Sequence, residues 1–388
     1  MTLVSAPRFE RHKMLPQPSH DEQSRQAFVK SFRGHLASKV VPGNYLAYEH
    51  RARHRFEREQ GHAPRDRHDI RRAMEADPYY QFWSAMQRRS QELMWEAVID
   101  PTEREWSQLI EQSREAAASR PTRRSRAKQL QGSLELDPTL AIPRYHAAVD
   151  IHLQPGGYHT DFIEDDVAAG AIYDRALNIY LNGALGPRNA LMGEMLAEYF
   201  ASRWPEHKPR RILDMGCAIG NSTLPWAAQY PHAEVHAIDV GAPVLRYAHA
   251  RAVTLGVPVH FSQQNAEQTR YDNGSFDLIV SHIMLHETSK TALTRIMTEC
   301  FRLLAPGGLM LHLEIPRGTS ALEQFLFNWE SYNNNETFGA YMTDVDLPAI
   351  ARLAGFAAPE LVRHRVERAP EQQLYSNETI WNILLARR

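Results

Sequence analysis

A loop rich in small residues, set between a short apolar run and an apolar helical segment, is the stretch of this sequence best suited to bind a ligand. The run 212–213 ends on an acid and leads into the loop residues Asp214, Gly216, Ala218 and Gly220. Glycines let the backbone turn sharply and lie directly against a ligand, and the helix that follows offers amide donors. A second apolar run, 235–238, ends on Asp239, whose carboxylate can accept both hydroxyls of a ribose. The two stretches predict a nucleoside pocket.

The stretch Leu213–Gly220 resembles motif I of the class I S-adenosylmethionine-dependent methyltransferases, with Ala218 in place of the middle glycine. The family's later motifs are matched in order by Asp239, by 265–267 after the third predicted strand, by 275–281 for the fourth and by 303–309 before the fifth. An ordered series at family-like intervals is far more specific than a glycine-rich loop alone. The resemblance covers roughly residues 165 to 388.

The resemblance implies that the cofactor is S-adenosyl-L-methionine (SAM). In the family, the motif I loop approaches the methionyl part and the ribose through its backbone, and the acid after the second strand takes the ribose hydroxyls. Asn265 stands where the family usually has an aspartate beside the adenine, and its carbonyl oxygen can still contact an exocyclic amine. The predicted cofactor residues are Asp214, Gly216, Ala218, Gly220, Asp239, Val240, Asn265, Ala266, Ser281 and Tyr173.

Methyl transfer is an in-line displacement, so the protein chiefly holds the nucleophile near the methyl group and excludes water. A general base helps when the acceptor carries a proton, and histidine suits neutral pH. The candidate catalytic residues follow the fourth predicted strand or end the fifth: His282, His286 and Glu314. His286 also matches a position that is commonly histidine in these folds without being catalytic, so a structural role stays open for it.

Acceptor-binding residues are predicted in two places. Family members usually bind the acceptor between the fifth strand and the two closing strands, and here the segment 325–336 combines aromatic, amide and acidic side chains. The turn 155–157 exposes its neighbours on a loop, where function concentrates. The predicted substrate residues are Tyr158, His159, Tyr180, Trp329, Tyr332, Asn334 and Glu336. Core packing is an equal alternative for Tyr173 and Tyr180. No metal site is predicted, because His152, His159 and Asp161 do not have the spacing of a strong ligand motif.

Alternating strand and helix patterns over 210–315 predict an α/β fold. With the resemblance, the expected architecture is a Rossmann-like, doubly wound, mostly parallel seven-stranded sheet with a mainly α-helical N-terminal domain. The expected divisions are a mobile tail at 1–25, a helical lid or substrate domain at 26–164 and the methyltransferase domain at 165–388. Within the helical part, an apolar stripe predicts a helix at 78–99 that Pro101 stops, and an Arg-rich surface turn follows at 114–128.

The composition is that of an ordinary protein outside the membrane. The 388 residues carry a formal net charge of −2, which gives no basic excess for binding nucleic acid or an anionic membrane. Two cysteines suit a reducing compartment, and no apolar run approaches the length of a membrane span. We therefore expect a small-molecule substrate, no nucleic-acid or membrane partner and a cytoplasmic location, with a homodimer left open.

The leading functional hypothesis is methyl transfer from SAM to an oxygen, nitrogen or carbon of a small-molecule acceptor. The large N-terminal addition also suits SAM-consuming cyclases of the azetidine-carboxylate type, which release methylthioadenosine. A third hypothesis is a SAM-binding regulator without catalysis. Product analysis distinguishes the three, because a methyltransferase yields S-adenosylhomocysteine, a cyclase yields methylthioadenosine and a regulator yields neither.

Overall fold

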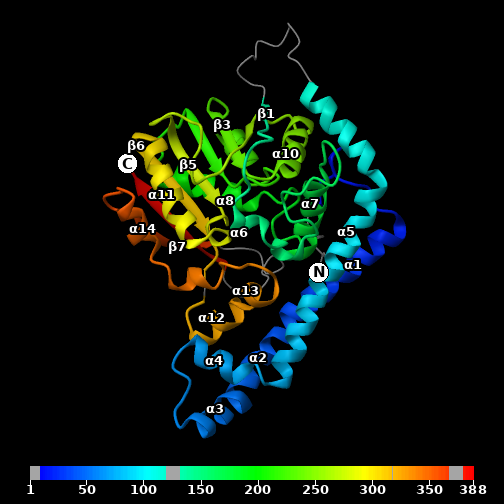
Figure 1. Ribbon diagram of the computed structural model, residues 1–388, viewed down its shortest axis with the longest axis vertical. Helices are drawn as coiled ribbons and strands as arrows, with labels where there is room; N and C mark the ends of the chain where they lie inside the picture. The colour runs from blue at the N-terminus through cyan, green and yellow to red at the C-terminus, as the bar shows by residue number, and fades with distance from the viewer. Residues whose placement is uncertain (1–8, 119–131, 317, 367–378) are drawn as a thin grey trace, which may run out of the picture.

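An eight-stranded sheet forms the centre of the protein (Figure 1). The computed structural model describes residues 9–118, 132–316, 318–366 and 379–388. The strands are β1 (Ser133–Glu135), β2 (Arg211–Met215), β3 (Glu234–Asp239), β4 (His260–Gln263), β5 (Phe276–His282), β6 (Leu304–Glu314), β7 (Glu360–Val366) and β8 (Thr379–Arg387). Their order is β1-β4-β3-β2-β5-β6-β8-β7, and only β8 runs antiparallel to its neighbours. The mostly parallel Rossmann-like sheet is confirmed, with one strand more than the seven predicted.

The additional strand, β1, comes from the region expected to be helical. It pairs in parallel with β4, so that Ser133 lies opposite His260. Gly132 permits this approach, because a Cβ atom there would lie 2.3 Å from the carbonyl oxygen of Val259. A strand of three residues carries no recognisable alternation of apolar and polar residues. This explains why the sequence pattern predicts helices and loops alone for 26–164.

Helices cover both faces of the sheet, as the alternation of side chains along the strands requires. In β2, Ile212 joins one apolar cluster and Leu213 joins the other. The first face is covered by α7 (Ala168–Tyr180), α8 (Leu191–Arg203), α9 (Leu224–Gln229) and α10 (Ala242–Thr254). The second face is covered by α11 (Lys290–Leu303) and α14 (Leu347–Leu353). The carboxyl ends of the central strands remain open to a ligand.

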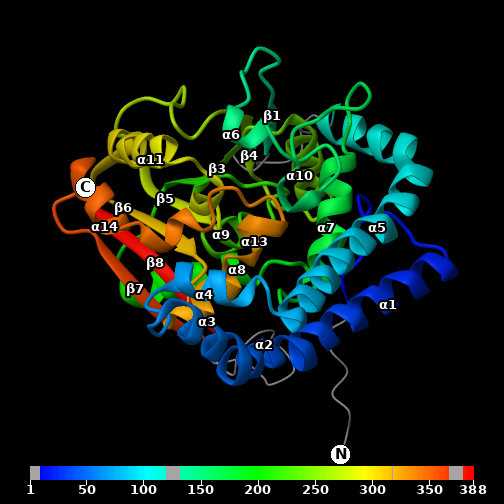
Figure 2. The same ribbon diagram turned by 60° about the horizontal axis from the view of Figure 1, so that its bottom comes forward.

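The N-terminal helices form an arm beside the sheet (Figure 2). They are α1 (His20–His35), α2 (Val41–Ala47), α3 (Arg53–Gln60), α4 (Arg67–Met74) and α5 (Pro78–Ala118). The prediction that Pro101 ends its helix is wrong, since α5 continues through it. Proline lacks the N–H that would bond the carbonyl of Ala97, and the side-chain amide of Gln26 donates to that carbonyl instead at 2.9 Å. The Arg-rich turn lies mostly outside the described residues.

The predicted mobile tail at 1–25 needs correction. Residues 1–8 lie outside the described part of the chain, but Met14 and Leu15 are buried and α1 already begins at His20. His12 Nε2 also lies 3.0 Å from the buried carboxylate of Asp174 on α7. Met14 and Leu109 of α5 belong to the same apolar cluster as the first face of the sheet. The N-terminal region therefore shares a core with the sheet.

Two short helices between β6 and β7 connect the sheet with the arm. These helices, α12 (Ala321–Phe327) and α13 (Trp329–Asn333), lie next to α4 and the start of α5 in Figure 1. Shorter turns complete the rim of the sheet: α6 (Arg144–Ala147), η3 (Ile151–Leu153), η4 (Leu285–Glu287) and η5 (Tyr341–Asp344). Within the described residues, no helix is both long and apolar enough to cross a membrane.

Candidate active site

The loop after β2 has the backbone geometry that its small residues allow. Gly216, Ala218 and Gly220 all have positive φ angles, of 71°, 45° and 71°. The N–H groups of Gly216 and Cys217 donate to the carbonyl of Ile238 at 2.8 and 3.0 Å, which ties the loop to the end of β3. Ala218 holds a left-handed conformation that favours glycine, so its backbone is strained. The loop is therefore fixed in place beside the cavity.

Asp239 supports this loop from the end of β3. One carboxylate oxygen accepts the N–H of Ala218 at 2.9 Å, and the other accepts the N–H of Gly241 at 2.9 Å. A carboxylate has about four lone-pair positions, so both oxygens keep capacity for a ligand's hydroxyls. Asp239 also lines the cavity. Its geometry is compatible with the predicted contact to a ribose.

Asp214 and His282 form a buried pair at the ends of β2 and β5. Asp214 accepts a hydrogen bond from Thr223 Oγ1 at 2.5 Å, and its second oxygen lies 3.3 Å from His282 Nδ1. Trp226 Nε1 donates to His282 Nε2 at 3.3 Å. Both ring nitrogens of His282 thus have protein partners, although the residue lines the cavity. Its role as a base stays a prediction.

A cavity opens at this edge of the sheet, with an empty volume of about 1100 Å³ that includes the solvent-open space at its mouth. Most of the predicted cofactor residues line it: Asp214, Gly216, Ala218, Asp239, Val240, Asn265, Ala266 and Tyr173. Two do not: Gly220 lies against the ring of Phe261, 3.1 Å from where its Cβ atom would be, and the hydroxyl of Ser281 pairs with His312 Nδ1 at 2.6 Å inside the sheet. A glycine-bearing cradle, an acceptor pair on Asp239 and an amide at Asn265 are donors and acceptors that fit an adenosyl group. The residues present therefore fit the implied cofactor.

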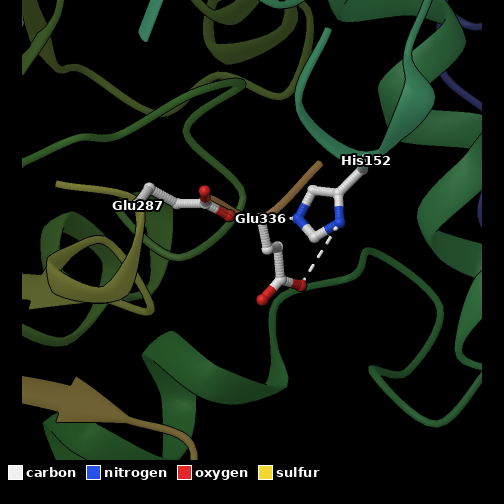
Figure 3. Close-up of side chains that lie close together, drawn as sticks. All are labelled: His152, Glu287 and Glu336. Atoms are coloured by element: carbon white, nitrogen blue, oxygen red, sulfur yellow. Dashed lines mark ion pairs between the residues drawn. The ribbon is translucent and has the colours of Figure 1, made fainter. Parts of the chain in front are cut away.

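Beyond the cofactor end of the cavity, five acidic and basic side chains form a chain of alternating type. Its members, in order, are Glu336, His152, Glu287, His286 and Glu314. Successive nitrogen–oxygen distances are 3.4, 3.1, 3.5 and 2.8 Å. Figure 3 shows the first three, with the two carboxylates beside different nitrogens of the His152 ring. We name this set the acid–base chain.

The members of the acid–base chain shift one another's pKa. Burial disfavours a charged His286, yet Glu314 and Glu287 raise its pKa to about 10. Burial opposes the charge of His152 as well, and Glu287 and Glu336 raise its pKa to about 9. Burial would raise the pKa of Glu287, but hydrogen bonds with the two histidines hold it well below its ordinary value. Burial raises the pKa of Glu336 to about 7 against the attraction of His152.

His152 reaches the cavity from a strained turn. Its φ angle is 56°, in the left-handed region that side-chain-bearing residues rarely adopt. Its carbonyl accepts hydrogen bonds from Gln91 Nε2 at 3.0 Å and Trp95 Nε1 at 2.8 Å, both on α5. Helix α5 thus fixes the turn that presents the imidazole. Neither His152 nor Glu287 is among the predicted site residues; the only sequence signal for Glu287 is its position next to His286.

The predicted substrate residues divide into two groups. Tyr158 lines the cavity, Asn334 Nδ2 lies 3.3 Å from His152 Nδ1, and Tyr180 donates to Glu330 at 3.2 Å beside Asn334. Together with Glu336, these residues lie at or behind the acid–base chain. Three others lie elsewhere. His159 packs on His146, Trp329 is buried against Trp83 in the arm, and Tyr332 is 39% exposed under the guanidinium of Arg71.

Glu314 stands behind His286 rather than in the cavity wall. One of its oxygens accepts the N–H of Leu285 at 2.8 Å and the other pairs with His286 Nδ1. Glu314 therefore orients the loop and the imidazole, while His286 itself lines the cavity. Catalytic roles for both residues stay predictions.

Comparison with known proteins adds a family to this geometry. Residues 212–308, which hold the loop, Asp239 and two members of the acid–base chain, His286 and Glu287, match the family model of a methyltransferase domain. These residues thus form a domain of the methyltransferase kind, and the chain resembles the class I SAM-dependent superfamily. The chain is 29% identical over 140 residues to a demethylmenaquinone methyltransferase of Thermus thermophilus, covering 34% of this chain and 63% of that protein.

A second relative is the trans-aconitate 2-methyltransferase of Methylobacterium radiotolerans, 34% identical over 113 residues that cover 28% of this chain and 39% of the relative. The chain therefore spans less than two thirds of each of these curated relatives. Among solved structures, a phosphoethanolamine N-methyltransferase of Haemonchus contortus has a TM-score of 0.42 at 17% identity, covering 60% of this chain and 61% of that one. The N-terminal arm lies outside the matched family model.

Proposed function

We propose that this protein transfers the methyl group of SAM to a small-molecule acceptor. The observation that carries the proposal is that the motif I loop, Asp239 and members of the acid–base chain line the same cavity. A site for a nucleoside cofactor thereby adjoins groups able to accept a proton. When bound, the cofactor supplies an electrophilic methyl group on a positively charged sulfur.

The residues of this chain would hold the two reactants and exclude water. Asp239 and the backbone of the loop would hold the adenosyl part, and Tyr158 and Tyr173 would enclose the reacting end with aromatic rings 5.2 Å apart. Both tyrosines are enclosed, and burial raises the pKa of each. They are therefore neutral at physiological pH, which suits a site where positive charge is lost during the reaction.

A small acceptor is supported by how the cavity is covered. Its roof comes from residues of the N-terminal region, among them Tyr145, His146 and His152. A cavity lined by side chains from both regions of the chain suits a cofactor together with a small acceptor better than a polymer. Two of the relatives are named for small acceptors, demethylmenaquinone and trans-aconitate, which supports the same acceptor class.

The test is incubation of the full chain with methyl-labelled SAM and a cell metabolite extract, followed by mass spectrometry. We expect a labelled small molecule and stoichiometric S-adenosylhomocysteine. Label found only in RNA, DNA or protein would overturn the acceptor class. Methylthioadenosine as the product would replace the methyltransferase with the cyclase, and the absence of any turnover beside measurable SAM binding would favour the regulator.

A further inference from the structure

Four histidines line the cavity, and they differ in what their ring nitrogens contact. Three of them have protein partners at both nitrogens, and at least one partner of each ring is a carboxylate. The fourth, His146 on α6, has a buried Nε2 that makes no hydrogen bond within the described residues. The three partnered rings are His152, His282 and His286.

His146 lies on the roof of the cavity, between two other rings. Its imidazole stacks on Tyr158, at 6.0 Å between centroids and 28° between planes, and packs on His159 at 5.4 Å. Tyr158 in turn meets Tyr173 edge to face at 5.2 Å. These two tyrosines are the rings that would enclose the reacting end of the cofactor, so His146 lies next to the proposed place of methyl transfer.

The unpartnered Nε2 of His146 calls for an explanation, because a buried polar atom loses its hydrogen bonds to water on folding. In the wall of a binding cavity, a ligand can supply the missing partner. The protein holds the residue in place without using this nitrogen: the backbone N–H of His146 donates to the carbonyl of Pro143 at 2.9 Å, and the neighbouring rings cover the imidazole. The nitrogen is thus positioned but chemically unused.

We propose that His146 is the base that takes the proton of the methyl acceptor, and that the acceptor therefore carries this proton on the oxygen or nitrogen that is methylated. The proposal rests on the proposed methyl transfer. Within the described residues, no carboxylate forms an ion pair with His146, so the neutral ring keeps a lone pair for the proton. The rings that lie between two carboxylates, His152 and His286, favour the protonated form instead.

The surroundings of His146 favour a neutral ring before the reaction and attract the charge that forms during it. Burial lowers the pKa of His146 below its ordinary value, against the attraction of Asp239 at the end of β3 and Glu287 in η4. The other titratable groups that face the ring are Tyr158 and His159. Burial raises the pKa of Tyr158 and lowers that of His159, so both are neutral at pH 7.

The step balances without any further reactant. A lone pair on the acceptor oxygen or nitrogen forms the bond to the methyl carbon. The bond from that carbon to the sulfonium sulfur breaks, and its electron pair stays on the sulfur. The acceptor's proton moves to Nε2 of His146, so the positive charge of the sulfonium is replaced by that of an imidazolium attracted by Asp239 and Glu287.

A metal ion is the alternative partner of this nitrogen. Nδ1 of His159 is also buried without a partner, so two neighbouring rings each offer a free nitrogen. Protein metal sites of the zinc type use three or four side-chain ligands. Within the described residues, the one group of three potential ligands is a different set, His152, Glu287 and Glu336. His146 and His159 thus lack a third ligand, which favours a proton over a metal ion as the partner.

The first test requires no acceptor. Histidine labelled with ¹⁵N reports the charge of each imidazole in the full chain with S-adenosylhomocysteine bound, and the signals missing from His146→Gln identify the ring of His146. We expect this ring to be neutral at pH 7, with a titration midpoint below the ordinary 6.5. A ring that is charged at pH 7 would overturn the proposal. Saturable binding of Zn²⁺ that both His146→Gln and His159→Gln abolish would replace the base with a metal site.

The second test measures turnover with the acceptor recovered by the labelling experiment. His146→Ala removes the imidazole and leaves space for a free one. We expect turnover to fall about 100-fold or more, with S-adenosylhomocysteine affinity within threefold of the parent. Imidazole added to the buffer should restore part of the rate, and the rise in rate with pH through the midpoint of His146 should disappear. His232→Ala, the same change at an exposed turn, is the control and should leave rate and affinity unchanged.

The outcomes separate this proposal from the function on which it rests. A folded parent protein that neither binds S-adenosylhomocysteine nor transfers label refutes the proposed function. Transfer by His146→Ala that keeps the parent's pH profile, whether fast or slow, refutes only the role of His146. Transfer to an atom that carries no exchangeable proton, such as the sulfur of a thioether, also refutes that role. If His146→Ala does not fold, His146→Gln, which cannot accept the proton, must show the same loss of turnover.

Discussion

At the scale of single residues, the carboxylate of Asp239 both supports the loop and faces the cavity. It accepts the N–H groups of Ala218 and Gly241 and offers its remaining lone pairs to the cavity. Asp239→Ala should therefore weaken SAM binding by about 1.5–3 kcal/mol, the size of a hydrogen bond that involves a charged group. Calorimetry with SAM measures the change. Asp239→Asn, which keeps one acceptor oxygen, should lose less, and equal affinity in a folded Asp239→Ala protein would remove Asp239 from the site.

The backbone of Ala218 is strained in a way that a glycine at this position would not be. A left-handed alanine is disfavoured by about 1–2 kcal/mol, and glycine removes this strain. Glycine also raises the conformational entropy of the unfolded chain, which offsets part of the stabilisation. Ala218→Gly should thus raise the free energy of unfolding by up to about 1 kcal/mol. Chemical denaturation measures it, with Ala228→Gly as the control that should destabilise. A loss of stability at 218 would show that the methyl group contributes packing that outweighs the strain.

The residues of the site differ in how far sequence alone could predict them. The residues at the cofactor end can be predicted from contiguous motifs, because the loop, its helix and the acids at strand ends are local features. The acceptor end depends on contacts between distant segments. His152 and Glu336 meet only because the arm and the segment after α13 converge, and the left-handed turn of His152 leaves no mark in composition or periodicity. Residue type alone predicts Trp329 as a substrate residue, but in the structure its side chain packs against Trp83.

At the scale of elements, Trp329 fastens the helices after β6 to the arm. Its side chain is 2% exposed, packs on Trp83 at 5.7 Å between ring centroids and donates to Ser84 Oγ at 2.8 Å. Trp329→Ala should lower the free energy of unfolding by about 3–5 kcal/mol, the usual cost of truncating a buried tryptophan. Urea denaturation measures this loss.

Tyr332, three residues further on, is the matched control. It is 39% exposed and lies under Arg71, so Tyr332→Ala should cost only about 1 kcal/mol. The same loss for both substitutions would show that α13 is not held by a buried core. If the turnover of Trp329→Ala fell by more than its fraction of folded protein, Trp329 would instead have a role in substrate binding.

Some helix ends and short strands cannot be predicted from the sequence pattern. The apolar stripe that predicts a helix from residue 78 is correct, but Pro101 does not end it because Gln26 satisfies the carbonyl that proline leaves unbonded. That compensation comes from another helix and cannot be read from the stripe. Strand β1 is likewise too short to show a pattern of its own. It is defined by its pairing with β4, which the close approach of Gly132 to Val259 permits.

At the scale of the whole molecule, the acid–base chain links folding to pH. The folded state raises the pKa of His152 to about 9 and that of His286 to about 10, from an ordinary value of 6.5. A raised pKa means that the folded state binds the proton more tightly than the unfolded state does. This stabilisation is fully present below about pH 6.5 and is lost as the pH rises through 9 and 10.

We therefore expect the Tm to fall steadily between pH 7 and pH 10. Glu287→Gln removes the carboxylate shared by both histidines, so this variant should be less stable at pH 7 and should show a shallower fall. Differential scanning calorimetry of the two proteins at matched ionic strength makes the comparison. Parallel curves for the parent and the variant would show that the histidines do not carry the expected charge.

The pairing of β1 with β4 has a consequence for the newly made chain. Ser133 leaves the ribosome 127 residues before its partner His260, and α5 packs on α10 only after residues 242–254 have been translated. At about 5–20 residues per second, the buried side of α5, including Leu109 and Ile110, waits on the order of ten seconds for its cover. The arm is thus translated early but finishes folding late, and during that interval its apolar side is a natural target for a chaperone.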